Sequence, residues 1–394
     1  MILLDILLGS LAAVLLVPVS VLFVQVMMAL PAYRPREMPT GRRPTLAILI
    51  PAHDEANVIA STLRSIAPQL VAGDRLLVVA DNCSDDTGAV ASAAGAEIIE
   101  RRDQERRGKG YALDFGVRHL ERNPPEVLVI IDADCDVGVG TIERLARVCL
   151  KTDRPVQGLY LMRATEGAGL KTRIAEFAWL VKNQVRPLGY HRLGFPCHLM
   201  GTGMAFPWPA ISTAALASGH IVEDLMLGID LARSGTPPLF CPEALVTSFF
   251  PISAEGIQGQ RTRWEHGHMG MILGAAPRLF VEAIAHGNVK LMALMLDLCV
   301  PPLALLMVLV LAMFAGSAVF FVATNLALPL WLATASLAML GLSVLSSWVQ
   351  YGREAISLSS LACAPFYVLW KMPLYLKFLV RRQVEWVRSK RDVD

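Results

Sequence analysis

Long runs without charged residues near both ends constrain this chain more than any other feature. Residues 301–322 and 326–349 contain no Asp, Glu, Lys or Arg, and residues 2–30 contain only Asp5. A helix of about 20 apolar residues spans the hydrocarbon core of a bilayer. Each run is long enough, so the sequence predicts three transmembrane helices. A composition that is 54% hydrophobic agrees with this prediction.

The first run is predicted to be an uncleaved helix whose C-terminal end faces the cytoplasm. A cleaved signal peptide is the alternative, but it requires basic residues at the start and a small-residue cleavage site. The sequence has neither of these around residues 2–30. Four arginines follow the run and favour the cytoplasmic side for that end; they are Arg34, Arg36, Arg42 and Arg43.

The C-terminal part leaves the number of crossings open. Residues 267–300 mix apolar and charged side chains, which is typical of helices at the membrane interface. The apolar segment within 355–380 is short and contains Pro365 and Pro373. If it crossed the membrane, the basic tail 381–394 would lie outside, against the positive-inside tendency. We therefore expect three crossings followed by a re-entrant or interfacial segment, with four crossings as the alternative.

Composition also excludes several classes of protein. The net charge is only +2, so no basic surface indicates a nucleic-acid partner. The seven cysteines are scattered and form no CxxC pair, which argues against a zinc knuckle and a disulfide framework. This cysteine usage fits a reduced cytosolic domain between the apolar ends.

The central region alternates short apolar runs with helical segments. The expected strands are 46–50, 75–80, 97–100 and 127–131, and the expected helices between them are 56–66, 87–94 and 111–120. This order is typical of an α/β fold with a mostly parallel sheet covered on both faces. Ligands bind beyond the carboxyl ends of such strands. The polar loops 51–55, 81–86 and 132–136 follow three of these ends and predict a nucleotide site.

Asp132 and Asp134 directly follow the apolar run 127–131. On a strand, side chains two residues apart point to the same side. Carboxylate oxygens are ligands for Mg²⁺ or Mn²⁺, and a diphosphate can fill further positions. Such a metal offsets the charge that develops on a departing nucleoside diphosphate. The pair therefore predicts a metal or nucleotide site.

Other polar motifs have a structural as well as a functional interpretation. Asp85 and Asp86 are best explained as helix caps. A cap does not explain Asp81, which lies directly at a strand end. Glu223 and Asp224 precede a helix expected from Leu225, where carboxylates favour the N-terminus; alternatively, the pair supplies a general base.

Cations, glycines and an aromatic residue complete the set of motifs. Lys109, between two glycines, suits a phosphate or a uracil carbonyl. Gly201 and Gly203 flank Thr202 and allow close approach of a sugar, or form a tight turn. In Gln-Arg-Thr-Arg-Trp, residues 260–264, a guanidinium can grip pyrophosphate and Trp264 offers a face for a sugar ring.

The order and spacing of these motifs resemble the family 2 glycosyltransferases, in particular the membrane-embedded branch with the cellulose, hyaluronan and poly-N-acetylglucosamine synthases. The resemblance covers roughly residues 44–270. It implies a GT-A fold, which is Rossmann-like, and a metal-dependent, inverting hexosyltransferase. Asp54 stands where the family has Asn, and Val222 where it has Thr; neither change removes a carboxylate.

The resemblance implies a role for each matching residue. Asp134 binds the metal, Mg²⁺ or Mn²⁺, and Asp224 is the catalytic base. Donor-binding residues are Pro51, Ala52, Asp54, Glu55, Asp81, Lys109, Asp132 and Arg263. Acceptor-binding residues are Gly201, Thr202, Gly203, Glu223, Gln260 and Trp264.

The expected chain order is an N-terminal transmembrane helix (1–31), a catalytic domain (44–266), interfacial helices (267–300), two transmembrane helices (301–350), the ambiguous segment (355–380) and the basic tail (381–394). We expect an integral inner-membrane enzyme with a cytoplasmic catalytic domain. It would move a hexose or N-acetylhexosamine from a UDP-sugar to a polysaccharide, in contact with membrane lipids and export subunits. A lipid-linked acceptor and a non-catalytic sugar-binding subunit are the alternatives.

Overall fold

A computed structural model describes residues 2–251, 254–366 and 375. The chain divides into two compact units. One contains residues 33–165 and 195–264 and holds the sheet; we call it the sheet unit. The described part of the other contains residues 2–32, 166–194 and 265–366 and is helical; we call it the helical unit. The basic tail 381–394 and most of the ambiguous segment lie outside the described residues.

The sheet unit is built on eight strands in the order β3-β2-β1-β4-β7-β6-β8-β5. Their bounds are β1 Leu46–Ala52, β2 Arg75–Asp81, β3 Glu97–Arg101, β4 Val127–Ile130, β5 Asp136–Val137, β6 Val156–Arg163, β7 Met204–Pro207 and β8 Leu239–Phe249. The pairs β1–β2, β1–β4, β2–β3 and β6–β8 are parallel. The predicted α/β class with a mostly parallel sheet is therefore confirmed.

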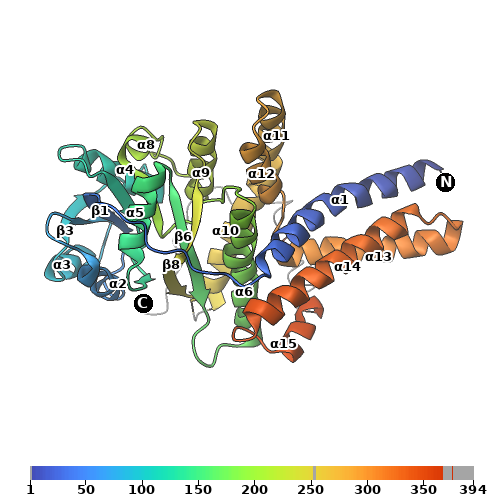
Figure 1. The fold of residues 1–394 in the computed structure, drawn as a ribbon. Helices are drawn as coiled ribbons and strands as arrows, with labels where there is room; N and C mark the ends of the chain where they lie inside the picture. The colour runs from blue at the N-terminus through green and yellow to red at the C-terminus, as the bar shows by residue number, and fades with distance from the viewer. Residues whose placement is uncertain (1, 252–253, 367–374, 376–394) are drawn as a thin grey trace. The chain divides into compact units, whose positions relative to one another are not determined.

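Strands β1, β2 and β4 are buried along nearly their whole length, and Figure 1 shows the sheet among the helices of its unit. Leu49 of β1 points to the face that α4 (Lys109–Leu120) covers, while its neighbours Ile48 and Ile50 point the other way, and all three are fully buried. The approach of α4 is close enough to require a glycine, since a Cβ on Gly116 would lie 2.4 Å from Leu49 Cδ1. Strands that are apolar on both faces are typical of a parallel sheet between helix layers.

The remaining helices of the sheet unit are α2 Ile59–Ile66, α3 Thr87–Ala93, α5 Thr141–Thr152, α8 Trp208–Ser212 and α9 Glu223–Arg233, with a short turn η1 at Ala67–Gln69. Helix α2 begins three residues later than the sequence predicts, because the Ala56 amide donates to Asp85 Oδ2 instead of opening a helix. Helix α9 begins earlier than predicted and includes Glu223 and Asp224 in its first turn.

Strand β7 is antiparallel to both β4 and β6, which the sequence did not predict. It follows the Gly-Thr-Gly turn, in which Gly201 and Gly203 have φ angles of 91° and 66°. These left-handed angles favour glycine. A Cβ on Gly203 would also lie 3.0 Å from Val246. The turn therefore leads the chain into β7, beside the end of β4.

Within the described residues of the helical unit, three helices are long and apolar enough to cross a membrane, Ile2–Ala29, Leu303–Thr324 and Leu328–Gly352. They correspond to α1, α13 and α14 (Leu328–Ser347), the last extended by a π-helical turn η3 at Trp348–Gly352. The other elements are α6 Leu170–Leu180, a π-helical turn η2 at Val181–Val185, α7 Arg186–Arg192, α11 Ala276–Ala285, α12 Val289–Leu298 and α15 Leu358–Ala362. Helix α10, Ala254–Gly274, contains the boundary between the units.

Candidate active site

Lys109 lies at the centre of the predicted donor and acceptor motifs. Its Nζ donates to Asp132 Oδ1 and to the carbonyl oxygen of Gly201, the latter at 2.7 Å. Burial opposes the charge on this ammonium, but Asp132, Glu223 and Asp224 outweigh that effect and raise the pKa of Lys109. The lysine therefore stays cationic and joins the loop after β4 to the Gly-Thr-Gly turn.

Among the described residues, three carboxylates act on this ammonium, those of Asp132, Glu223 and Asp224, and that of Asp134 acts on Asp132. Asp132 interacts with Asp134 and Asp224 as well as with Lys109, and Glu223 interacts with Asp224 and Asp132. Burial raises the pKa of Asp132, against the effect of Lys109. Burial, and then the charge of Asp224, raise the pKa of Glu223 to about 7. A site with more carboxylates than ammonium groups fits a divalent cation.

The loop after β4 is held by the Gly-Thr-Gly turn. Strand β4 ends at Ile130, so Asp132 and Asp134 lie in the loop instead of on the strand. The Asp132 amide donates to the fully buried Thr202 Oγ1 at 2.9 Å. Gln157 is also fully buried, and its side-chain Nε2 donates to the carbonyl oxygen of Thr202 at 2.9 Å. Gln157 was not identified from the sequence, because a single polar residue in β6 has no local signal.

Asp224 lies in the first turn of α9, where the helix dipole favours a negative charge. Its Oδ1 accepts from the Leu225 amide at 2.8 Å. A Cβ built on Gly201 would lie 3.5 Å from Asp224 Oδ2 and 3.7 Å from Lys109 Nζ. Glycine at position 201 therefore leaves space beside the carboxylate that the sequence predicts to be the base.

A pocket adjoins Lys109 along the chain. It is lined by His53, Asp81, Asn82, Gln104, Arg107 and Gly108. Asp81 ends β2 and forms an ion pair with Arg101, with 2.7 Å between Asp81 Oδ1 and Arg101 Nη1. Burial raises the pKa of Asp81, and Arg101 opposes that rise. Arg101 was missed by the sequence analysis, although its place at the end of a strand beside the predicted site was a usable signal.

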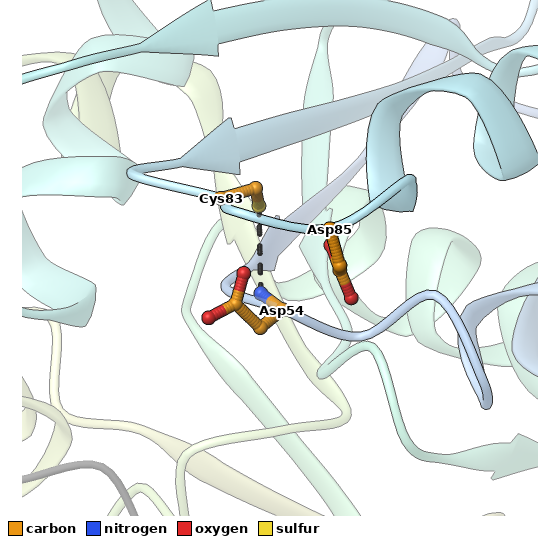
Figure 2. A group of neighbouring side chains, drawn as sticks. All are labelled: Asp54, Cys83 and Asp85. Atoms are coloured by element: carbon orange, nitrogen blue, oxygen red, sulfur yellow. Dashed lines mark hydrogen bonds between the residues drawn. The ribbon is translucent and has the colours of Figure 1, made fainter. Parts of the chain in front are cut away.

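The loops after β1 and β2 are bonded to each other around Asp54, Cys83 and Asp85 (Figure 2). Ligand atoms of these three residues lie within 4.8 Å of one another, as metal ligands would. Asp54 Oδ1 accepts from the Ser84 amide at 2.6 Å, and Asp85 Oδ2 accepts from the Ala56 amide at 3.0 Å. These bonds account for the cluster as a connection between two loops.

Asp85 and Asp86, both predicted to be helix caps, differ in their contacts at the start of α3. Asp85 Oδ1 accepts from the Thr87 amide at the start of α3, while Asp86 stands at the N-cap without a side-chain cap bond. Pro51 and Ala52 are the last residues of β1, and the Glu55 amide donates to Thr87 Oγ1.

Gln260, Arg263 and Trp264 lie half-buried on α10. Residues three and four positions apart share one face of a helix, so the three side chains point to the same side. Their contact with the diphosphate or acceptor remains a prediction.

A polar pocket and an acidic cluster, joined through the half-buried Lys109 on a mostly parallel sheet, are typical of a transferase of the GT-A type. The model of the family described as "Glycosyltransferase like family 2" matches residues 44–267, more than half of the chain. The chain belongs to this family and is a family 2 glycosyltransferase.

Individual relatives are more distant. A glucosyl-3-phosphoglycerate synthase of Mycolicibacterium paratuberculosis is 37% identical over 97 residues, which are 23% of this chain and 28% of the relative. A probable glycosyltransferase of Bacillus subtilis, YdaM, is 24% identical over 247 residues, 60% of this chain and 58% of the relative. The chain thus spans less than two thirds of the length of either relative.

The fold is similar to that of a solved mannosyltransferase structure. A mannosyltransferase from Pyrobaculum calidifontis, in complex with GDP-Man and Mn²⁺, aligns with a TM-score of 0.56. The alignment covers 95% of this chain and 100% of that chain at 15% identity. The likeness concerns the fold.

Proposed function

We propose that this chain transfers a sugar from a UDP-sugar to a growing polysaccharide at a membrane, with inversion at the anomeric carbon. The observation that carries this proposal is the position of Lys109. Gly108 lines the polar pocket, and Lys109 directly follows it and contacts Asp132. A nucleoside in the pocket would therefore direct its diphosphate toward Lys109 and the carboxylates, and Arg263 would bind the same diphosphate.

The residues present fit a divalent metal. Asp134 would hold Mg²⁺ or Mn²⁺, with Asp132 on the donor side beside Lys109. The fit rests on the excess of carboxylates over ammonium groups in the described cluster. When bound, the metal offsets negative charge on the departing diphosphate.

Asp224 is the base in this proposal. A single displacement requires one group that removes the proton from the acceptor hydroxyl and no protein nucleophile. The space beside Gly201 gives an acceptor access to Asp224 Oδ2. Glu223, Thr202, Gly203, Gln260 and Trp264 would bind the acceptor sugar, with the indole of Trp264 under the ring.

The membrane location is supported by the three long apolar helices of the helical unit. We propose an integral inner-membrane protein with a cytoplasmic catalytic domain, similar to the synthases of extracellular polysaccharides. Membrane lipids and export subunits are its proposed partners. In this proposal residues 267–300 lie at the membrane interface, and their mixed apolar and charged composition supports it.

The test is to incubate membranes containing the protein with labelled UDP- and GDP-sugars and to size the products. Incorporation from one UDP-sugar into long products supports the proposal. Products with a single added sugar that extract into organic solvent would identify a lipid acceptor instead. If no donor is consumed while sugar still binds, the chain is a non-catalytic subunit. An Asp224→Asn variant made in parallel is the matched negative control.

A further inference from the structure

One oxygen of the Asp81 carboxylate is fully engaged by two neighbours. Arg101 Nη1 donates to Oδ1 at 2.7 Å, and Asn82 Nδ2 donates to the same oxygen at 3.1 Å. A carboxylate oxygen has two lone pairs, so these donors occupy both. Among residues 2–251 and 254–366, the hydrogen bonds made to this carboxylate all end on Oδ1. Asp81 also lines the pocket, where Oδ2 is the oxygen left to accept from a ligand.

Arg101 is held in place from several sides. It lies opposite Asp81 in the parallel register of β2 and β3, and the side chains of both residues are only 9% exposed. Its Nη2 donates to Asp103 Oδ2 at 3.0 Å and to the Arg106 carbonyl oxygen at 2.7 Å. The Tyr111 ring lies beneath the guanidinium, with 5.5 Å from Cζ to the ring centre. Such contacts leave the guanidinium little freedom to rotate away from Oδ1.

The same contacts fix the wall of the pocket. Loop 102–108 supplies Gln104, Arg107 and Gly108 to the lining of the pocket. Arg101 connects this loop to Asp81 through its hydrogen bonds to both. Asn82 makes a second connection to the loop, because its Oδ1 accepts a hydrogen bond from the Asp103 backbone amide at 2.8 Å. Asn82 has a left-handed φ of 52°, which turns its side chain back to this loop.

We propose that Arg101 and Asn82 are positioning residues that limit Asp81 to a single accepting oxygen and thereby select uracil over guanine. This inference rests on the proposed function, which places the donor nucleoside in the pocket. Uracil offers one N–H between two carbonyl oxygens and needs one acceptor. Guanine offers a ring N–H and an adjacent amino group, and it would need both carboxylate oxygens. Cytosine and adenine present a ring nitrogen lone pair, which a carboxylate repels.

The expected selectivity follows from leaving one guanine donor unsatisfied. Such a loss costs about 1–3 kcal/mol, which corresponds to roughly fivefold to 150-fold in affinity. The experiment measures UDP and GDP binding by calorimetry to the full-length protein in detergent, with Mn²⁺ present. We expect UDP to bind at least about tenfold more tightly than GDP. Equal or tighter binding of GDP would overturn the inference.

Three variants test the positioning role. Asn82→Gly keeps a backbone that accepts the positive φ and frees one lone pair of Oδ1, so the ratio of UDP to GDP affinity should fall. Arg101→Met should lower UDP affinity by about tenfold and narrow the ratio further, with a larger effect on donor KM than on kcat. Arg101→Lys should restore part of the UDP affinity, because a lysine still donates to Oδ1. Arg102→Met is the control, since Arg102 is 81% exposed and pairs with Glu100.

The outcomes separate this inference from the proposed function. If transfer from a UDP-sugar occurs but the affinity ratio is the same in all variants, the positioning role is wrong and the proposed function stands. If the ratio of UDP to GDP affinity responds as expected but no sugar is transferred, the positioning role stands and the proposed function is wrong. If Arg101→Met does not fold, Asn82→Gly is the deciding variant. An unchanged ratio of UDP to GDP affinity in Asn82→Gly contradicts the inference.

Discussion

Lys109 determines how charge is distributed at the active site. It compensates Asp132 directly and lies close enough to Glu223 and Asp224 to be influenced by both. The carboxylates outnumber it, which leaves a net negative charge for a cation to balance. The sequence predicted that Lys109 binds the donor, but its hydrogen bond to the carbonyl oxygen of Gly201 joins residues 92 positions apart and has no local signal.

Replacement of Asp134 tests the metal site at the scale of a single residue. We expect Asp134→Ala to lower transfer by at least about a hundredfold, because metal assistance to a departing diphosphate is worth several kcal/mol. A chelator should have the same effect on the wild type. Asp136→Ala is the matched control, since Asp136 is exposed and lies two residues further on. Full activity of Asp134→Ala in the presence of chelator would refute the metal role.

The carboxylate pair on α9 should control the pH dependence. Burial and the charge of Asp224 raise the pKa of Glu223 to about 7. Below that pH the pair retains a proton, so kcat/KM for the acceptor should rise as pH increases through about 7. Glu223→Gln removes the group whose pKa is raised to about 7, so the rise in this pH range should be lost. Asp224→Asn should lower turnover by about 10² or more at every pH.

A pH profile of the two variants beside the wild type is the measurement. If Glu223→Gln leaves the midpoint unchanged, the coupling of the pair does not govern the reaction. If Asp224→Asn retains its turnover and loses donor affinity instead, Asp224 is not the base.

At the scale of elements, the sequence predicted β1, β2, β3 and β4 closely because their apolar runs end at polar loops. It did not predict the direction of β7. That strand has only four residues, all buried. Its antiparallel pairing is set by β4 and β6, which no pattern within β7 reveals. The same limit applies to Gln157, because its partner Thr202 is distant in the sequence.

A substitution in helix α4 tests whether packing positions Lys109 in the candidate active site. A Cβ on Gly110 would lie 2.5 Å from the Leu216 carbonyl oxygen and 2.6 Å from that of Ser218. We expect Gly110→Ala to lower the free energy of unfolding by about 1–3 kcal/mol, as overpacking does. It should also lower transfer, because Lys109 and the segment leading to Glu223 would be pushed apart.

Gly88→Ala is the control for this helix prediction. It lies on α3, and its added Cβ would be 3.7 Å from the nearest atoms, an ordinary contact. Denaturant unfolding and transfer assays on both variants provide the measurement. Equal stability and equal activity of the two variants would show that the contact of Gly110 with residues 216–218 does not position the site.

At the scale of the whole chain, residues 166–194 leave the sheet unit and join the helical unit. The predicted catalytic domain, 44–266, includes these residues, and its bounds stay a prediction. A polar network inside the helical unit holds this segment. Arg186 Nη2 donates to Asp297 Oδ1 at 2.6 Å, and Gln25 Nε2 donates to the same oxygen at 2.6 Å. Gln25 was visible in the sequence only as a polar residue in an apolar run.

This network joins α1, α7 and α12, and its loss should affect the folding of the chain as a whole. The side chains of Arg186 and Asp297 are 8% and 13% exposed. Removing one partner of a buried pair leaves an uncompensated charge and costs about 3–5 kcal/mol, whereas replacing both with apolar groups can be neutral. We therefore expect Asp297→Leu to lower stability strongly and Arg186→Met with Asp297→Leu to recover most of the loss.

Thermal unfolding of the full-length protein in detergent is the measurement, with Arg278→Met as the control because Arg278 is exposed on α11. The double variant decides the matter. If it is as unstable as Asp297→Leu, the cost comes from lost packing, and the pair is not the element that joins the three helices. If it recovers, the single variant fails because a charge is left unpaired, and residues 166–194 are held in the helical unit by electrostatic complementarity between sequence-distant helices.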